Sequence, residues 1–496
     1  MVRNRVAVPD VVAALDARLR TIVVEIGIEC DDAATPMSRL HCLASHVRES
    51  RSRSELWLLA AAVCGELPTS DLLRTLERAL ALASEGNAHL AVLEACGGPA
   101  SVCETVGQRF DVVGGIVIDV DFSARHGHST GIQRVTRETV KRWRRDHDVR
   151  LVAWTIDGEI MRELRDDELG RVVEWTSANR SDRPAADALE AGPFVVPWAA
   201  TVIVPEVGEP RLLERLACMA EWSGNRVIII GHDMIPISTP ADVLASETNR
   251  FVQYLSVVKH ASLIVTVSEA TATEFESYFT ALEPQGLRRP PIIPVPLPVE
   301  APPVRPTASS RAPDGPPLVL CVGSLEPRKN QSAILAAAQI LWRDGDRFRL
   351  RFIGGTAGQL SGEFFDEVAR AERAGRPVEV YTSAGDDLLA ESYDEARFTV
   401  FVSRAEGFGL PVGESLAMGR PVITSDHGSM AEIARGGGCI VVPARDDAAI
   451  AKAMRRLLFD DELHARLVAE ARSRPSRTWD DYAEELWAVS VGYEAS

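Results

Sequence analysis

The stretch from Glu406 to Glu414 combines two carboxylates and three glycines at a spacing that suits a ligand with phosphate and hydroxyl groups. It reads Glu-Gly-Phe-Gly-Leu-Pro-Val-Gly-Glu, and Pro411 is a favoured first residue of a helix. Gly407 and Gly409 allow the backbone to approach a ligand closely, and the helix start offers unpaired N–H groups at a positive dipole end. These features predict a phosphate seat, beside which Glu414 can accept hydrogen bonds from two neighbouring hydroxyls.

Two adjacent cations, Arg328 and Lys329, lie in the segment Val322-Gly-Ser-Leu-Glu-Pro-Arg-Lys-Asn330. They precede a helix expected over 331–342, with Asn330 as its N-cap. The helix dipole disfavours cations at this position, and a bound diphosphate would remove the conflict. Arginine grips phosphate oxygens in a fork and lysine supplies a compact charge. A solvated loop is the alternative interpretation.

Polar residues also follow strands expected in the first half of the chain. His232 and Asp233 follow an apolar run over 226–230, at the edge of a parallel sheet where ligands usually bind. Asp119 and Asp121 spell D-x-D, a common three-residue pattern that is also found in metal sites. We expect no metal here, because the Arg-Lys pair already provides the positive charge that a metal would bring.

These segments need an alternation of strands and helices to position them. Such an alternation runs from residue 114, and it restarts after a segment that holds twelve prolines between Pro284 and Pro317. Apolar strands joined by helices predict α/β architecture with parallel sheets, and the prolines predict a stiff linker. Residues 1–110 instead have helical periodicity, with a helix expected over 70–83. Strands are expected over 115–120, 150–154, 201–204, 226–230 and 262–267, and then over 318–322, 350–353, 378–381, 399–402, 421–424 and 439–442.

Three stretches resemble motifs of one enzyme family, the retaining glycosyltransferases of family 4. The 406–414 stretch resembles its E-x7-E signature, the 323–329 stretch its G-x-L-x-x-R-K element, and residues 130–135 the T-G-I-Q-R-V loop of one branch. The resemblance spans about residues 115–490 and implies the GT-B fold, two doubly wound Rossmann-like domains that face a cleft. It implies an acceptor-side domain (111–300), to which a helix over 477–496 crosses back, and a nucleotide-sugar donor domain (301–476). The helical residues 1–110 precede these domains as an extension.

The resemblance also implies residue roles. In that family the first glutamate contacts the donor sugar, the second holds the ribose, and the Lys and Arg neutralise the leaving diphosphate. The implied catalytic residues are Glu406, Lys329, Arg328 and His232, the last near the donor sugar. The implied donor-binding residues are Gly323, Ser324, Glu414, Gly407, Phe408, Gly409 and Leu410, with Tyr381 and Gly385 near the nucleobase. Ser324 stands where many members carry an arginine. The implied acceptor-side residues are Thr130, Gly131, Gln133, Asp233 and Ser268, although Ser268 also suits a helix cap and Tyr381 a core position.

The predicted function is therefore transfer of a hexosyl group from a nucleotide-diphosphate sugar to a hydroxyl acceptor, with retention of configuration and without metal or cofactor. The acceptor is a glycan, a lipid-linked glycan, a protein or a small molecule. A non-catalytic sugar-nucleotide-binding scaffold and a sugar-nucleotide epimerase on the same fold are the alternatives.

Composition limits the class of protein. With 46% hydrophobic residues the chain can bury a core, and its net charge of −17 argues against a nucleic-acid partner. Eight cysteines without a C-x-x-C pair indicate reduced, buried thiols.

We see no signal peptide or membrane span, and expect a cytoplasmic protein. A basic helix over 132–145 suits either solvent or peripheral contact with the inner membrane surface, and the extension suits homo-oligomerisation.

Overall fold

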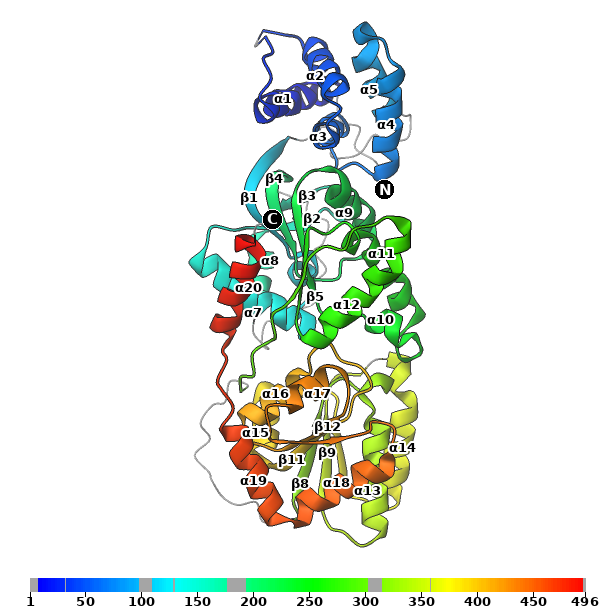
Figure 1. Cartoon of the computed structure of the whole chain (residues 1–496), viewed down its shortest axis with the longest axis vertical. Helices are drawn as coiled ribbons and strands as arrows, with labels where there is room; N and C mark the ends of the chain where they lie inside the picture. The colour runs from blue at the N-terminus through cyan, green and yellow to red at the C-terminus, as the bar shows by residue number, and fades with distance from the viewer. Residues whose placement is uncertain are drawn as a thin grey trace.

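The structure, a computed structural model, describes residues 8–31, 33–97, 109–127, 130–175, 193–301, 315–356 and 358–493. A group of helices, a seven-stranded sheet and a six-stranded sheet follow one another along the longest axis (Figure 1). Helices cover both sheets, so the predicted α/β class with a helical N-terminal region is confirmed. In the described part of the chain, no helix is both long and apolar enough to cross a membrane.

Five helices form the N-terminal group. The fourth was expected over 70–83, and Thr69 caps it by accepting a hydrogen bond from the Leu72 N–H. The third is apolar on all sides, so it is buried, and the guanidinium of Arg53 at its start lies 4.3 Å from the ring of Trp222 in the next unit. The group therefore shares one apolar core with the seven-stranded sheet. The helices are α1 (Val8–Ile26), α2 (Pro36–Ser50), α3 (Arg53–Cys64), α4 (Ser70–Leu82) and α5 (Ala88–Cys96).

The seven-stranded sheet is parallel except for β3, which runs antiparallel between β2 and β4. Its strands are β1 (Phe110–Asp119), β2 (Arg150–Trp154), β3 (Met161–Glu163), β4 (Phe194–Val204), β5 (Arg226–Gly231), β6 (Leu263–Thr266) and β7 (Ile292–Pro294). Its helices are α6 (Asp121–Arg125), α7 (Gly131–Asp146), α8 (Asp166–Val173), α9 (Pro210–Trp222), α10 (Ile235–Ser238), α11 (Ala245–Val258) and α12 (Glu269–Leu282).

Strand β7 corrects one expectation. It lies inside the proline-rich segment that was predicted to be only a linker, and Pro294 is its last residue. The strand is short and pairs with β6 at the edge of the sheet, where a missing N–H donor is tolerated. Val295 and Leu297, which follow it, are buried in the core. Residues 302–314 of the segment lie outside the described part.

All six strands expected in the second half form a parallel sheet in the order β10-β9-β8-β11-β12-β13. They are β8 (Leu318–Val322), β9 (Arg349–Ile353), β10 (Val378–Tyr381), β11 (Ala396–Phe401), β12 (Val422–Ser425) and β13 (Cys439–Val442). The connecting helices are η6 (Pro327–Lys329), α13 (Gln331–Arg343), α14 (Gly362–Arg373), α15 (Asp386–Glu395), α16 (Leu410–Ala417), α17 (Gly428–Ala434), α18 (Asp447–Phe459) and α19 (Asp461–Arg472).

The helix α20 (Trp479–Gly492) leaves the six-stranded unit and lies beside α7 of the seven-stranded unit (Figure 1). The indole N–H of Trp143 donates to the Ala483 carbonyl at 2.8 Å, and the rings of His147 and Trp487 stack at 3.7 Å. The chain therefore passes twice between the two sheet units. The domain boundaries proposed at residues 110, 300 and 476 stay predictions.

The cysteines in the described residues are all free thiols. Only Cys218 and Cys321 are fully buried, so the expectation of uniformly buried thiols is wrong for the other five described ones, which are half-buried. Cys103 lies outside the described residues.

Candidate functional site

The strand order of the six-stranded sheet reverses between β8 and β11, which pair with each other. Ligands of open α/β sheets bind beyond the carboxyl ends of the strands at such a switch point. Arg328 and Lys329, in η6, follow β8, and Glu406 follows β11. The topology thus brings together the two motif stretches that the sequence singled out.

Glu406 forms ion pairs with both cations. Lys329 Nζ lies 2.5 Å from one carboxylate oxygen and Arg328 Nη1 lies 3.1 Å from the other, while Arg328 Nη2 reaches Glu326 at 2.8 Å. Burial alone would raise the pKa of Glu406, but Lys329 and Arg328 outweigh it and hold that pKa below its usual value. Burial lowers the pKa of Lys329, and the charge of Glu406 opposes that effect. The cluster thus brings two basic and two acidic side chains together in a largely buried setting.

The glycine loop after Glu406 lies against the seven-stranded unit. A Cβ atom on Gly407 would lie 1.9 Å from the His232 carbonyl oxygen, so only glycine permits this approach. Gly409 precedes α16 with φ of 101°, in the left-handed region that favours glycine, and a Cβ there would meet the Met430 side chain at 2.0 Å. The start of α16 therefore lies at the junction of the two sheet units.

Hydrogen bonds fasten this junction. The hydroxyls of Ser268 and Thr271 at the start of α12 donate to the Gly407 carbonyl at 2.6 and 3.1 Å. Ser268 also accepts from the Thr271 N–H, so the helix-cap interpretation of Ser268 is confirmed. The carboxylate of Glu432 in α17 accepts from the backbone N–H groups of Glu269 and Ala270. The loop thus connects α12 and α17 across the two units.

His232 lies at the end of β5, next to this loop. Its Nε2–H donates to the Pro205 carbonyl at 2.8 Å, and burial lowers the pKa of the imidazole, so the ring is neutral with Nδ1 as a hydrogen-bond acceptor. Asp233 accepts from the Ile235 N–H. Burial raises the pKa of Asp233, while the nearby Arg328 opposes the rise. Asp233 therefore lies near the predicted cation cluster from the opposite unit, while the His232 ring is held by the Pro205 carbonyl beside it.

Glu414, in α16, has both carboxylate oxygens engaged. Tyr393 donates its hydroxyl to Oε2 at 3.0 Å, and Arg134 from α7 forms an ion pair with Oε1. Burial, together with Glu414, raises the pKa of Tyr393 well above its usual value, so the phenol stays a donor. Arg134 belongs to the T-G-I-Q-R-V stretch but was interpreted only as part of a basic helix face.

The remaining predicted residues of the six-stranded unit fall around the same strand ends. Ser324 donates to Glu326, and Gly323 has φ of 147°. Tyr381 ends β10 half-buried, 5.7 Å from the Arg351 guanidinium, and Gly385 is exposed at the start of α15. Phe408 is buried.

On the opposite unit, Leu410 lies next to Gly131 of α7. The Gln133 side chain accepts from the Thr130 N–H at 3.2 Å and so closes the first turn of α7.

Asn330 was expected to cap α13 with its side chain, but it does not do so. It has φ of 61°, and its amide Nδ2 donates to the carbonyls of Val402 and Ala444. The residue therefore fastens the cation-bearing turn to the end of β11 instead.

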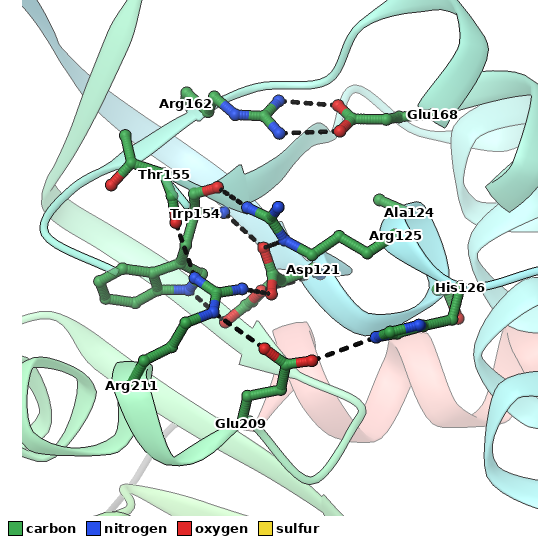
Figure 2. Close-up of polar contacts among 12 residues, drawn as sticks. Asp121, Ala124, Arg125, His126, Trp154, Thr155, Arg162, Glu168, Glu209 and Arg211 are labelled. Carbon is green, nitrogen blue, oxygen red and sulfur yellow. Dashed lines mark hydrogen bonds and ion pairs between the residues drawn. The ribbon is translucent and has the colours of Figure 1, made fainter. Parts of the chain in front are cut away.

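The D-x-D pair forms protein contacts. Asp121 accepts from the Trp154 N–H at 2.8 Å and forms ion pairs with Arg125 and Arg211 (Figure 2). Asp119 accepts from the Trp154 indole N–H. Within the described ranges, no three metal-ligating side chains gather in a way that could hold an ion.

The basic face of α7 is mostly engaged within the protein. Arg142 and Arg145 pair with Asp480 of α20, and Arg137 donates to the His126 carbonyl. Lys141 and Arg144 are exposed. Membrane contact through this helix stays a prediction.

Residues 307–474 match the family model "Glycosyl transferases group 1". The match covers about a third of the chain and contains both the cation turn and the E-x7-E stretch.

Curated relatives agree with that match. A serotype-specific mannosyltransferase, WbdA of Escherichia coli, is 25% identical over 339 residues, which are 64% of this chain and 40% of the relative. D-inositol 3-phosphate glycosyltransferase of Acidothermus cellulolyticus is 34% identical over 254 residues, 48% of this chain and 55% of the relative. The chain thus spans about half the length, or less, of these relatives.

Solved structures show the same fold. HepE of Anabaena, in complex with UDP and glucose, superposes with a TM-score of 0.54 at 14% identity over 77% of this chain and 100% of that one. Sucrose-phosphate synthase of Thermosynechococcus elongatus superposes with a TM-score of 0.51 at 16% identity, over 76% of this chain and 98% of that one. The two-sheet GT-B architecture expected from the sequence is confirmed.

Residues at the site that were not predicted include Arg134, Thr271, Glu326 and Tyr393. Thr271 follows Ser268 by three residues, the spacing of a helix cap, which was a usable signal. Membership of the T-G-I-Q-R-V stretch was a usable signal for Arg134, whereas nothing in the sequence distinguishes Tyr393 from a core residue.

Proposed function

We propose that the chain transfers a hexosyl group from a nucleotide-diphosphate sugar to a hydroxyl acceptor, with retention of configuration and without a metal. The observation that carries the proposal is the buried cluster of Arg328, Lys329 and Glu406 at the switch point, next to the start of α16. The match to the glycosyltransferase family model over 307–474 supports it. The names of the mannosyltransferase relatives make mannose the first sugar to test.

The proposed chemistry is charge stabilisation. As the bond between the sugar and the diphosphate breaks, negative charge grows on the leaving group. Arg328, Lys329 and the N–H groups at the start of α16 are in place to stabilise it, in a buried setting where fixed charges act strongly. Glu406 exchanges its contacts with these cations for hydroxyls of the donor sugar.

The acceptor proton needs a base. A leaving phosphate oxygen can take it, because it lies on the same face of the sugar as the incoming hydroxyl in a retaining reaction. The backbone carbonyl of His232 lies against the same loop, and the neutral ring, with Nε2–H on the Pro205 carbonyl, is assigned to orient the donor sugar by accepting a hydrogen bond at Nδ1. With two cations at the leaving group, the reaction has no need of a divalent ion, so EDTA is expected to leave turnover unchanged.

The first test is a screen of nucleotide sugars by thermal shift. A donor at 100 times its dissociation constant adds about 2.7 kcal/mol of stability, which is readily measured. With that donor, Glu406→Gln should lower turnover at least about 100-fold, equivalent to about 2.7 kcal/mol of barrier, because the shape remains and the charge is lost.

Glu432→Gln serves as the matched control, since Glu432 belongs to the same junction but lies away from the cations. Near wild-type turnover in Glu406→Gln would remove Glu406 from the site. Inhibition by EDTA that magnesium or manganese reverses would contradict the metal-free mechanism.

A further inference from the structure

An ion pair crosses from the seven-stranded unit to the carboxylate that is proposed to hold the ribose. Arg134 lies in the first turns of α7, and its guanidinium contacts Glu414 Oε1 in α16, 280 positions along the chain. Glu414 is largely buried, with 8% of its side chain exposed, and Arg134 retains 31%. The pair therefore forms only while α7 and α16 lie side by side.

Glu414 depends on this contact because it is a buried charge. Burial would lower the pKa of Arg134, but Glu414 outweighs it and raises that pKa, which shows that the two charges stabilise each other. Tyr393 supplies one neutral hydrogen bond to the other oxygen. A buried carboxylate that loses its cation is strongly disfavoured and moves toward solvent.

Arg134 is itself fixed by its surroundings. Its guanidinium lies 5.7 Å from the ring of Trp479 at the start of α20, and Trp143 on the same helix is hydrogen-bonded to Ala483. Helix α7 thus belongs to the seven-stranded unit together with α20. Movement of the two sheet units away from each other would withdraw Arg134 from Glu414.

We propose that Arg134 is a positioning residue for donor recognition, which holds Glu414 in the orientation that hydrogen-bonds to the ribose hydroxyls. It does so only when the two sheet units are closed on each other. A carboxylate has about four acceptor positions, and Arg134 and Tyr393 use one on each oxygen, so two remain for the 2′- and 3′-hydroxyls. Ribose recognition is thereby linked to closure. This inference rests on the proposed function and assigns to Arg134 a role within it.

The test measures how strongly binding depends on the ribose. UDP and GDP are each titrated by calorimetry beside their 2′,3′-dideoxy counterparts, and the ratio of the two dissociation constants is compared among variants. Hydrogen bonds to a charged group are worth about 1.5–3 kcal/mol, so the wild-type ratio is expected to be about tenfold or more. Arg134→Gln should reduce that ratio nearly to the value for Glu414→Gln, close to one.

Arg144→Gln is the matched control, because Arg144 is an exposed arginine of the same helix. It should keep the wild-type ratio. Arg134→Lys, which keeps the charge but loses the planar fork, should give an intermediate ratio and protects the test if the glutamine variant unfolds. Small-angle scattering without nucleotide should show a larger radius of gyration for Arg134→Gln than for Arg144→Gln.

The outcomes separate the inference from the function on which it rests. A wild-type ratio in Arg134→Gln overturns the inference, as does equal weakening of the ribose and dideoxy forms, which would place Arg134 on the phosphates. A wild-type protein that binds nucleoside diphosphates without regard to the ribose also overturns it. A wild-type protein that binds none of them refutes the proposed function itself.

Discussion

Replacing Gly407 with alanine tests whether the loop of Glu406 must lie against the seven-stranded unit. A Cβ at this position would lie 1.9 Å from the His232 carbonyl oxygen, and real Cβ atoms do not approach closer than about 3.0 Å. The obstacle is backbone, which cannot rotate aside as a side chain can. The loop or the whole unit must therefore retreat by about 1.1 Å or more.

That movement has two measurable costs. It breaks the hydrogen bonds from Ser268 and Thr271 to the Gly407 carbonyl, which together contribute about 1–3 kcal/mol to closure. It also displaces Glu406, the preceding residue, and a misplacement of about 1 Å at a reacting centre costs on the order of 100-fold in rate. Gly407→Ala should thus lower turnover about 100-fold, while the free energy of unfolding falls by no more than about 1–3 kcal/mol.

The assay is steady-state transfer from the donor found by the thermal-shift screen. Gly362→Ala is the control, since a Cβ there meets open space in the same sheet unit. If Gly407→Ala retained wild-type kcat and KM, the contact with His232 would be irrelevant to catalysis and the closed arrangement would not be the active one.

Three further predictions address other parts of the molecule. Lys329→Ala should weaken nucleoside diphosphates far more than the bare nucleoside in calorimetry, because Lys329 is assigned to phosphate; equal weakening contradicts that. Burial raises the pKa of Glu206 to about 7 in the folded protein. Protonation of Glu206 therefore stabilises the folded state. This stabilisation is fully present below the unfolded pKa of about 4 and is lost as the pH rises through 7. Glu206→Gln, which keeps both contacts to Ser123, should flatten the decline in melting temperature between pH 5 and pH 8, and an unchanged slope would refute the assignment. A chain that begins at Asp111 should still bind the nucleotide sugar. It should lose solubility or self-association, measured by light scattering, because α3 shares an apolar core with α9. Loss of donor binding in a folded protein would contradict the domain division.

The predictable part of the fold consists of apolar runs. Every strand of the six-stranded sheet is rich in aliphatic or aromatic residues, although β9, β10 and β11 also hold charged residues, so each was found, with small shifts at the ends. Strand β3 was missed because it has only three residues, and two of them, Arg162 and Glu163, are charged. Their side chains are buried or paired in the structure, which the sequence alone does not indicate. Strand β7 lies among prolines that normally exclude a strand, and only its edge position permits it.

The candidate site likewise has a part that could be predicted from the sequence and a part that could not. The cation turn and Glu406 could be brought together from sequence because each follows a strand, and neighbouring strands of a parallel sheet end at one edge. The pairing of Arg134 with Glu414 could not, since it depends on how two separate sheets pack. The conformation of Asn330 was missed for a related reason: its amide bonds to two distant carbonyls rather than to its own helix.

The return of α20 has a consequence for how the chain folds during synthesis. Trp479, Tyr482 and Leu486 are buried against the seven-stranded unit, which the ribosome begins to make more than 300 residues earlier. Domains generally fold as they emerge, but here the earlier sheet exposes an apolar strip beside α7 until the later sheet has been made. The nascent chain must therefore keep that strip from aggregating for the roughly 15 to 60 seconds that 300 residues take at about 5–20 residues per second.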